Sequence, residues 1–183
     1  MKQDLRFKKT ERLIRQTALE LLSKKCIEEI TVGEICEKAE ISRNTFYGHF
    51  EDKFSLLKKF SEDFAEELAI HIENLSPETG YENSIRLTAE ILFEYLSEHE
   101  KLLRILSKND PKFWDTFENR LCEIVAKYSD DKKTYLYSVY SCGATVNCLK
   151  RYFGSKIEMK PEEFVQYLTE IATECNSFMK ERI

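Results

Sequence analysis

The sequence is poor in the residues that break regular structure. Its 183 residues include 5 Gly and 3 Pro, and no Pro occurs before Pro77. Because tight turns depend on these two residue types, their scarcity argues against turn-rich β-sandwiches and barrels and against linker-rich chains. Apolar residues make up 42% of the chain and charged residues 33%, which is enough apolar material for a core and too much for disorder. The composition therefore predicts a folded chain with few turns.

The chain also lacks a long apolar run. Its longest uncharged stretch, residues 134–149, has 16 residues and includes Ser, Thr and Asn side chains, whereas a membrane-spanning helix needs about 20 mostly apolar residues. The first 18 residues hold six Lys and Arg side chains and no apolar run of the kind found in secretory signals. We therefore expect a soluble, cytoplasmic protein without a membrane partner.

Six cysteines and three histidines are present, but their spacing does not form a metal site. No C-x-x-C pair occurs, and zinc needs about four ligands at close spacing. A nucleophile elbow, a phosphate-binding glycine loop and an H-E-x-x-H motif are likewise missing from the sequence. The sequence thus predicts no metal, no cofactor and no catalytic residue, and the thiols are expected to be small buried hydrophobes in a reducing compartment.

Helical periodicity runs through most of the chain, and no segment alternates as a strand does. In the first segment, Ile14, Ala18 and Leu22 fall on one face. Each of the three prolines lies where a helix is expected to begin. The predicted fold class is all-α, with a short helix after Thr31 and further helices over residues 8–24, 43–50, 54–72, 78–98, 102–106, 111–128, 131–153 and 161–180.

Two capping residues define the spacing of a helix-turn-helix. Thr31 and Glu34 form a capping box that begins a short helix, and Ser42 is the natural cap of the next one. Two short helices joined by a tight turn are the layout of a helix-turn-helix, whose second helix enters the major groove of DNA. Arg43 and Asn44 then occupy the first reading positions, since arginine pairs with guanine and asparagine with adenine through two hydrogen bonds.

Other residues of the same segment suit the sugar-phosphate backbone, which supplies much of the affinity of a DNA-binding protein. Hydroxyl, imidazole and ammonium groups can donate to phosphate oxygens, and a helix N-terminus favours an anion. Gly48 has no side chain, which lets the backbone approach DNA but weakens the helix by ~1 kcal/mol relative to Ala. The expected DNA-binding residues are Thr31, Arg43, Asn44, Thr45, Tyr47, Gly48, His49 and Lys53.

The same residues carry a resemblance to a known family. The motifs are Ile30-Thr31-Val32, Ala39-Glu40-Ile41-Ser42 and Thr45-Phe46-Tyr47-Gly48-His49-Phe50, followed by Lys53 and Leu56-Leu57. This run resembles the DNA-binding domain of TetR-type repressors over about residues 8–60. The family usually has Gly where this chain has Glu40, and a left-handed conformation there would cost about 1 kcal/mol or more.

The resemblance implies an all-helical homodimer with two domains. It implies a helix-turn-helix DNA-binding domain, residues 1–52, and a helical ligand-binding and dimerisation domain, residues 53–183, that pairs through its last two helices. The uncharged residues 134–149 predict a helix buried on several sides, which suits either a core helix or a dimer helix. The implied function is a repressor that binds a palindromic DNA operator and is released by a small-molecule effector.

Candidate effector-binding residues are less specific. Polar anchors for a ligand are His71, His99, Arg104 and Asn147. An aromatic series at helical spacing more often forms plain core than a pocket, and its members are Phe60, Phe64, Phe93, Phe113, Trp114, Phe117 and Tyr137. The ligand-binding residues therefore stay unassigned.

Two other function classes are compatible with an all-helical chain. A helical enzyme, or a carrier of small molecules or metals, would need ligands such as Glu-x-x-His pairs on facing helices, and Glu94, Glu98 and His99 lack that spacing. An adaptor that keeps the fold without binding DNA would leave the basic first helix without a role. Salt-sensitive DNA binding separates the three classes.

The distribution of charge favours DNA, although the net charge of −5 argues against it. Residues 1–60 hold 13 Lys and Arg against 10 Asp and Glu, whereas residues 61–183 hold 15 against 23. The acidity therefore belongs to the second domain, while the expected DNA-binding domain is mildly basic.

Overall fold

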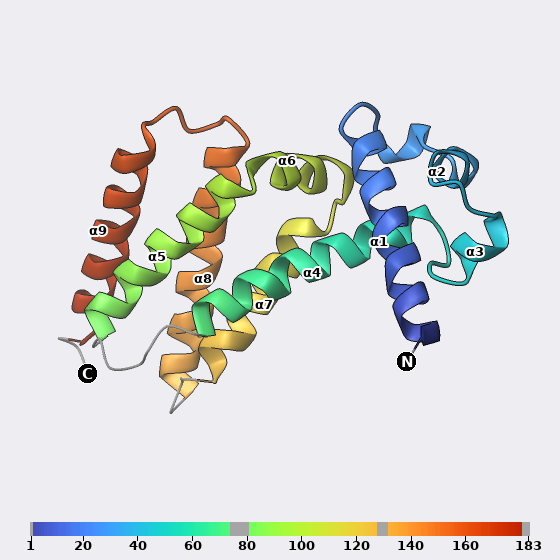
Figure 1. Ribbon diagram of the computed structural model, residues 1–183. Coiled ribbons are helices and arrows are strands. Elements are labelled where there is room, and N and C mark those ends of the chain that lie inside the picture. The colour runs from blue at the N-terminus through green and yellow to red at the C-terminus, as the bar shows by residue number, and fades with distance from the viewer. Residues whose placement is uncertain (1, 74–80, 128–131, 181–183) are drawn as a thin grey trace. The chain divides into compact units, whose positions relative to one another are not determined.

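The computed structural model describes residues 2–73, 81–127 and 132–180 (Figure 1). Within these ranges every regular element is helical, which confirms the all-α fold class. The elements are α1 (Lys2–Leu22), the 3₁₀ turn η1 (Ile27–Glu29), α2 (Val32–Lys38), α3 (Arg43–Tyr47), α4 (Lys53–Glu73), α5 (Tyr81–Glu98), α6 (Glu100–Asn109), α7 (Phe113–Ala126), α8 (Lys132–Phe153) and α9 (Pro161–Lys180). The expected start of α8 at Asp130-Asp131 lies outside the described residues.

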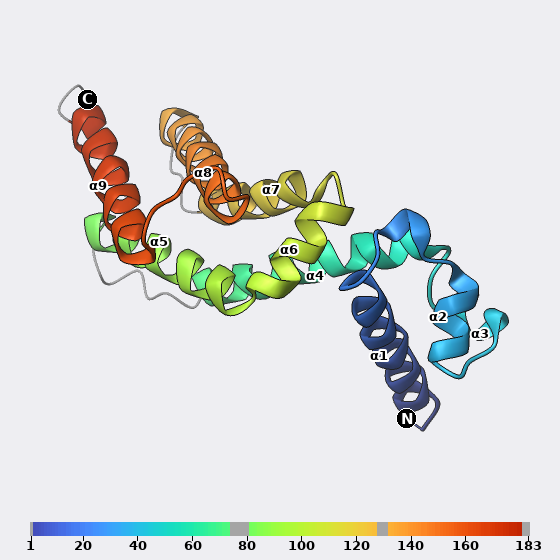
Figure 2. The same cartoon turned by 90° about the horizontal axis from the view of Figure 1, so that it is seen from above.

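The chain forms two compact units, and the first holds the helix-turn-helix. This unit consists of Met1–Ser61 together with Ile105–Phe113. In it α1 packs on α2, and α2 packs on α3 (Figure 2). Ile14 and its neighbours on the apolar face of α1 are buried as the periodicity predicts, although α1 begins at Lys2 and not at residue 8. The proposed functional division after residue 52 stays a prediction.

Helix α3 is shorter than its periodicity predicts, because it ends at Tyr47 and not at residue 50. The amide of Gly48 still donates to the Asn44 carbonyl, but the amides of His49 and Phe50 both converge on the carbonyl of Phe46. Phe46 and Phe50 are buried, as expected, and they anchor this short helix to the unit.

Glu40 adopts the left-handed conformation, with φ of 52°, directly after α2. Its amide donates to the carbonyl of Glu37, and the amide of Ile41 donates to that of Cys36. These two bonds make a Schellman ending, in which the left-handed position normally favours glycine. The strained turn expected from the sequence is therefore present.

The end of α6 is tied to the first unit by buried polar contacts. Asn109 accepts a hydrogen bond from the amide of Ile27 at 2.7 Å and donates to the Ile105 carbonyl. The Ser61 hydroxyl donates to the carboxylate of Asp110 at 2.6 Å. Because buried polar groups must be paired, these bonds fix residues 105–113 in register against η1 and α4.

The second unit, Glu62–Arg104 with Trp114–Ile183, has an aromatic interior. In it α9 packs against α5 and α8 (Figures 1 and 2). The ring of Phe93 lies between 5.4 and 5.9 Å from those of Tyr152, Phe153 and Phe164. The other aromatic candidates for a pocket are buried too, Phe64, Trp114 and Phe117 in this unit and Phe60 and Phe113 in the first, while the Tyr137 side chain lies outside the described residues.

Helix α8 is only partly buried within one chain, so a single chain does not bury it on several sides as a core helix alone would require. Val146 and Leu149 are buried, but Leu136 and Tyr140 are 68% and 69% exposed. Phe54 is a correction: its spacing predicts a place in the apolar stripe of α4, yet it is 52% exposed, with the Lys53 ammonium 5.2 Å from its ring.

None of the helices in the three described ranges combines the length and the apolar character needed to cross a membrane. Within the same ranges, no group of three or more His, Cys, Asp and Glu side chains is placed to hold a metal ion. The five cysteines whose side chains are described are free thiols.

Candidate DNA-binding site

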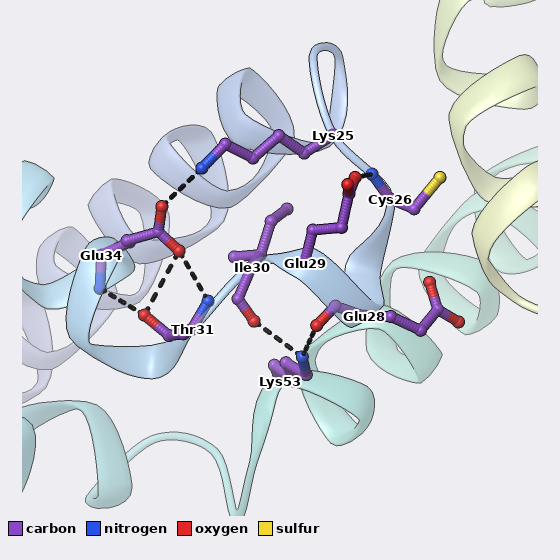
Figure 3. Close-up of polar contacts among 8 residues, drawn as sticks. All are labelled: Lys25, Cys26, Glu28, Glu29, Ile30, Thr31, Glu34 and Lys53. Carbon is purple, nitrogen blue, oxygen red and sulfur yellow. Dashed lines mark hydrogen bonds and ion pairs between the residues drawn. The ribbon is translucent and has the colours of Figure 1, made fainter.

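Helix α2 begins at a complete capping box (Figure 3). The Thr31 hydroxyl accepts from the amide of Glu34 at 3.1 Å, and the Glu34 carboxylate accepts from the amide of Thr31 at 2.9 Å. The hydroxyl of Thr31 also lies 3.2 Å from that carboxylate. The groups that the sequence pattern assigns to a phosphate are therefore engaged in the cap.

Lys25 completes this cap from the preceding loop. Its ammonium lies 2.6 Å from the Glu34 carboxylate (Figure 3). The hydrogen bond from Lys25, together with that from the Thr31 amide, lowers the pKa of Glu34 from 4.5 to about 2. Glu34 is thus held as an anion at the N-terminus of α2, where the helix dipole also favours negative charge.

Helix α3 begins at Ser42, as the sequence predicts. The Ser42 hydroxyl accepts from the amide of Thr45 at 3.0 Å, and the two hydroxyls lie 2.8 Å apart. Since one hydroxyl proton is enough for that contact, the other remains available to an acceptor outside the protein. The cap positions Thr45 at the edge of the α3 surface.

Arg43 and Asn44 occupy the first turn of α3 and are both exposed. The terminal nitrogen of Arg43 lies over Gly33 in the first turn of α2, 3.1 Å from the position that a β-carbon there would take. Gly33 therefore makes room for the guanidinium. The two predicted base-reading residues stand side by side on the open surface of a capped helix.

Tyr47 and Gly48 end the exposed surface of α3. Tyr47 is 54% exposed, and its ring packs edge-on against buried Phe46 at 5.6 Å. Gly48 has φ of −72°, so its backbone does not require glycine. A β-carbon at Gly48 would lie 3.4 Å from the Thr45 carbonyl, which is an ordinary contact.

His49 lies in the turn after α3, where it meets the first helix. Its ring stacks on that of Phe7, with centroids 3.9 Å apart and planes at 29°. The Nδ1 atom of His49 is buried without a hydrogen-bond partner, which leaves Nε2 as the ring nitrogen able to contact DNA. Sequence reasoning missed Phe7, although its spacing of seven residues from Ile14 places both on one face of α1.

Lys53, at the start of α4, points inward to the protein backbone. Its ammonium donates to the carbonyls of Ile30 at 2.7 Å and Glu28 at 3.0 Å (Figure 3). These bonds join α4 to the end of η1. Two of the three ammonium protons thus bond to backbone carbonyls. Lys53 therefore has a structural role, holding α4 against the end of η1, that the sequence pattern does not indicate.

The predicted site residues therefore fall into two groups. Arg43, Asn44, Thr45, Tyr47, Gly48 and His49 lie in α3 and the turn after it, on either side of buried Phe46, and each is exposed or half-buried. Thr31 and Lys53 instead hold the ends of neighbouring helices. The first group is therefore the more accessible part of the candidate DNA-binding site, because Thr31 and Lys53 use their polar groups within the protein.

The polar candidates for effector binding in the second unit make contacts within their own helices. Arg104 pairs with Glu100 at 2.6 Å, and Asn147 accepts from Arg151 at 3.1 Å. His99 is different, since its ring stacks on the buried ring of Tyr95 at 4.3 Å. Tyr95 donates to the carboxylate of Glu67 at 3.1 Å, and burial raises the pKa of this phenol.

Comparison with known proteins agrees with the geometry of the first unit. The family described as bacterial regulatory proteins, tetR family, matches residues 14–60. The uncharacterized HTH-type transcriptional regulator YxbF of Bacillus subtilis is 32% identical over 98 residues, 52% of this chain and 26% of that protein. The HTH-type dhaKLM operon transcriptional activator DhaS of Lactococcus lactis is 28% identical over 126 residues, 68% of this chain and 64% of the relative. The chain thus spans less than two thirds of each of these curated relatives.

Solved structures share the fold over most of the chain. A Syntrophomonas wolfei protein assigned to the TetR family superposes with a TM-score of 0.74 at 21% identity, covering 90% of this chain and 93% of the other. A TetR transcriptional regulator from Streptococcus agalactiae gives a TM-score of 0.66 at 22% identity and covers 94% and 98%.

The fold and the site define a helix-turn-helix protein with a helical second unit. More closely, residues 14–60, which hold the motif around Phe46, match the family described as bacterial regulatory proteins, tetR family. The relatives are named as transcriptional regulators and not as enzymes.

Proposed function

We propose that this chain is a sequence-specific DNA-binding regulator of transcription and that α3 is its recognition helix. The observation that carries the proposal is the exposure of Arg43 and Asn44 on the first turn of a helix that Ser42 caps and Phe46 anchors. A recognition helix reads base edges from its N-terminal residues, and these two side chains suit guanine and adenine. Thr45, Tyr47 and His49 are proposed to contact phosphates around them.

We further propose that the chain acts as a homodimer through α8 and α9. Apolar side chains on these two helices are exposed in the single chain, and exposed apolar side chains that gather on one surface mark an interaction site. They are Tyr135, Leu136, Tyr140, Tyr167 and Ile171. Two-fold symmetry would then pair two recognition helices with a palindromic operator whose half-sites are about 34–36 Å apart, or a multiple of that.

The proposed output is repression in the cytoplasm, relieved by a small-molecule effector. Repression needs only that the bound dimer blocks a promoter. The Lactococcus lactis relative is named an activator, however. A promoter reporter therefore distinguishes repression from activation. Effector binding would act by favouring one of two dimer conformations.

The test is selection of bound sequences from random DNA with the full chain, followed by affinity measurements over a salt series. We expect a palindromic sequence whose binding weakens linearly with the logarithm of salt concentration. Asn44→Ala should cost about 1–3 kcal/mol and relax the preference at one base pair of each half-site. Asn119→Ala, the same change at an exposed position of α7, is the matched control and should leave the preference unchanged.

The alternatives give different results. A folded dimer indifferent to DNA would identify an adaptor and reject the proposal. Binding of all sequences with equal affinity would reject sequence-specific regulation. The effector is sought separately, by measuring which metabolites shift the thermal unfolding of the protein and weaken its DNA complex.

A further inference from the structure

The first two turns of α1 extend along the surface beside α3. Phe7 stacks on His49 at 3.9 Å, and Thr10 and Glu11 are half-buried on the same side of the helix. Below them, Ile14 continues the same face into the core. The start of α1 is therefore held against the domain by a row of contacts that ends at Phe7.

His49 is itself rigidly placed at the end of α3. Its amide donates to the carbonyl of Phe46 at 2.9 Å, which fixes the turn directly after Tyr47. The stack on His49 thus connects α1 to the end of the recognition helix and not to the body of the domain. Phe7 is still 48% exposed, so the contact covers one side of its ring and leaves the other open.

Basic side chains flank Phe7 in the chain. Arg6 and Lys9 are exposed in the same turns of α1, and fully extended side chains of this kind reach several ångströms beyond the backbone. Phe7 contacts the turn directly after α3. Charges in the same turns of α1 therefore start close to the end of the helix that we propose enters the major groove, whose borders are lined by phosphates.

We propose that Phe7 is a positioning residue, which stacks on His49 and so holds Arg6 and Lys9 beside the recognition helix as additional phosphate contacts. The inference rests on the proposed DNA-binding function. It extends the DNA-binding surface to a segment before the family match, which begins at residue 14. Without the stack, the first turns of α1 would fray, as helix ends do, and the two charges would no longer be held at a fixed place.

The experiment measures the affinity of the full chain for its selected operator from 50 to 300 mM salt. Arg6→Ala with Lys9→Ala should reduce the steepness of the salt dependence by about 0.9 for each phosphate that is no longer neutralised. Phe7→Ala should reduce it by a similar amount, although it removes no charge. Phe7→Trp, which can stack on His49, should restore the wild-type dependence. In the Phe7→Ala background, removing Arg6 and Lys9 should have little further effect.

Leu13→Ala is the matched control, because Leu13 is an apolar residue of the same helix and is similarly exposed, at 44%. It should leave both affinity and salt dependence unchanged, and thermal unfolding verifies that each variant is folded. An unchanged salt dependence in Phe7→Ala, with the wild type binding its operator, overturns the positioning role and leaves the proposed function intact. Failure of the wild type to bind any DNA overturns both proposals.

Discussion

The guanidinium of Arg43 lies over Gly33, so that a methyl group on Gly33 would come within 3.1 Å of its terminal nitrogen. Gly33→Ala should raise the free energy of unfolding by about 0.5–1 kcal/mol, because alanine is the better helix former. It should also displace Arg43 and change the base preference in each half-site. Urea unfolding measures the first effect and sequence selection the second. In an Arg43→Ala background the second effect should vanish, and its persistence there would contradict a role for Gly33 in placing Arg43.

Lys53 is expected to matter for stability as well as for DNA binding. Lys53→Met keeps much of the aliphatic stem but leaves the carbonyls of Ile30 and Glu28 without their charged donor. We expect the free energy of unfolding to fall by about 1.5–3 kcal/mol, the usual range for hydrogen bonds to a charged group. Unfolding in urea without DNA provides the measurement. A variant as stable as the wild type would show that Lys53 is free to serve DNA alone.

Glu40 lies in a conformation that favours glycine, with φ of 52°. Glu40→Gly should therefore stabilise the protein by up to about 1 kcal/mol, since it removes the clash of the β-carbon with the backbone. Glu37→Gly is the control within α2, where the backbone is helical and the same substitution should destabilise the protein. The prediction fails if both variants are less stable than the wild type.

The capping box should make stability depend on acid pH. The pKa of Glu34 is lowered from 4.5 to about 2, so its contribution is fully present above pH 4.5 and disappears as the pH falls through about 2. Relative to the wild type, Glu34→Gln should therefore gain in stability as the pH falls from 5 towards 2. Denaturant unfolding at several pH values provides the comparison. Parallel curves for the two proteins would rule out this source of acid sensitivity.

The exposed apolar face of α8 and α9 predicts the effect of charge there. Tyr140→Glu together with Leu136→Glu should yield a folded monomer, because a buried unpaired carboxylate opposes association. A monomer can occupy only one half-site at a time, so operator binding should weaken by roughly 10²–10⁴-fold. Analytical ultracentrifugation and binding to full and half operators measure the two effects. The change Leu13→Glu, on an exposed site of α1, should leave the dimer intact.

Features that depend on neighbouring residues in the chain could be predicted from the sequence. The caps at Thr31 and Ser42 each join residues three apart, and the strain at Glu40 follows from the local turn. The end of α3 was predicted less well, because it depends on the way the His49 and Phe50 amides converge on one carbonyl. The helical periodicity of the sequence does not determine which carbonyl these two amides bond to.

The functional roles of long polar side chains were the least predictable part. A lysine at the spacing of Lys53 suits either phosphate or carbonyl oxygens, and the choice depends on bringing residues 23 positions apart into contact. Phe54 likewise departs from its helical spacing, since its ring is 52% exposed and the Lys53 ammonium lies 5.2 Å from it. The partner of a long, flexible side chain therefore depends on which polar groups the packing of the helices brings within its reach.

The sequence by itself therefore determined the all-helical fold, the positions of the caps and the match of residues 14–60 to the tetR family, because short-range periodicity and capping specify helices locally. Only the tertiary structure decided that Gly33 makes room for Arg43, that Phe7 meets His49 and that Lys53 faces the backbone. The physical reason is that these contacts join separate helices, so their existence depends on the packing of the elements and not on the preferences of any one of them.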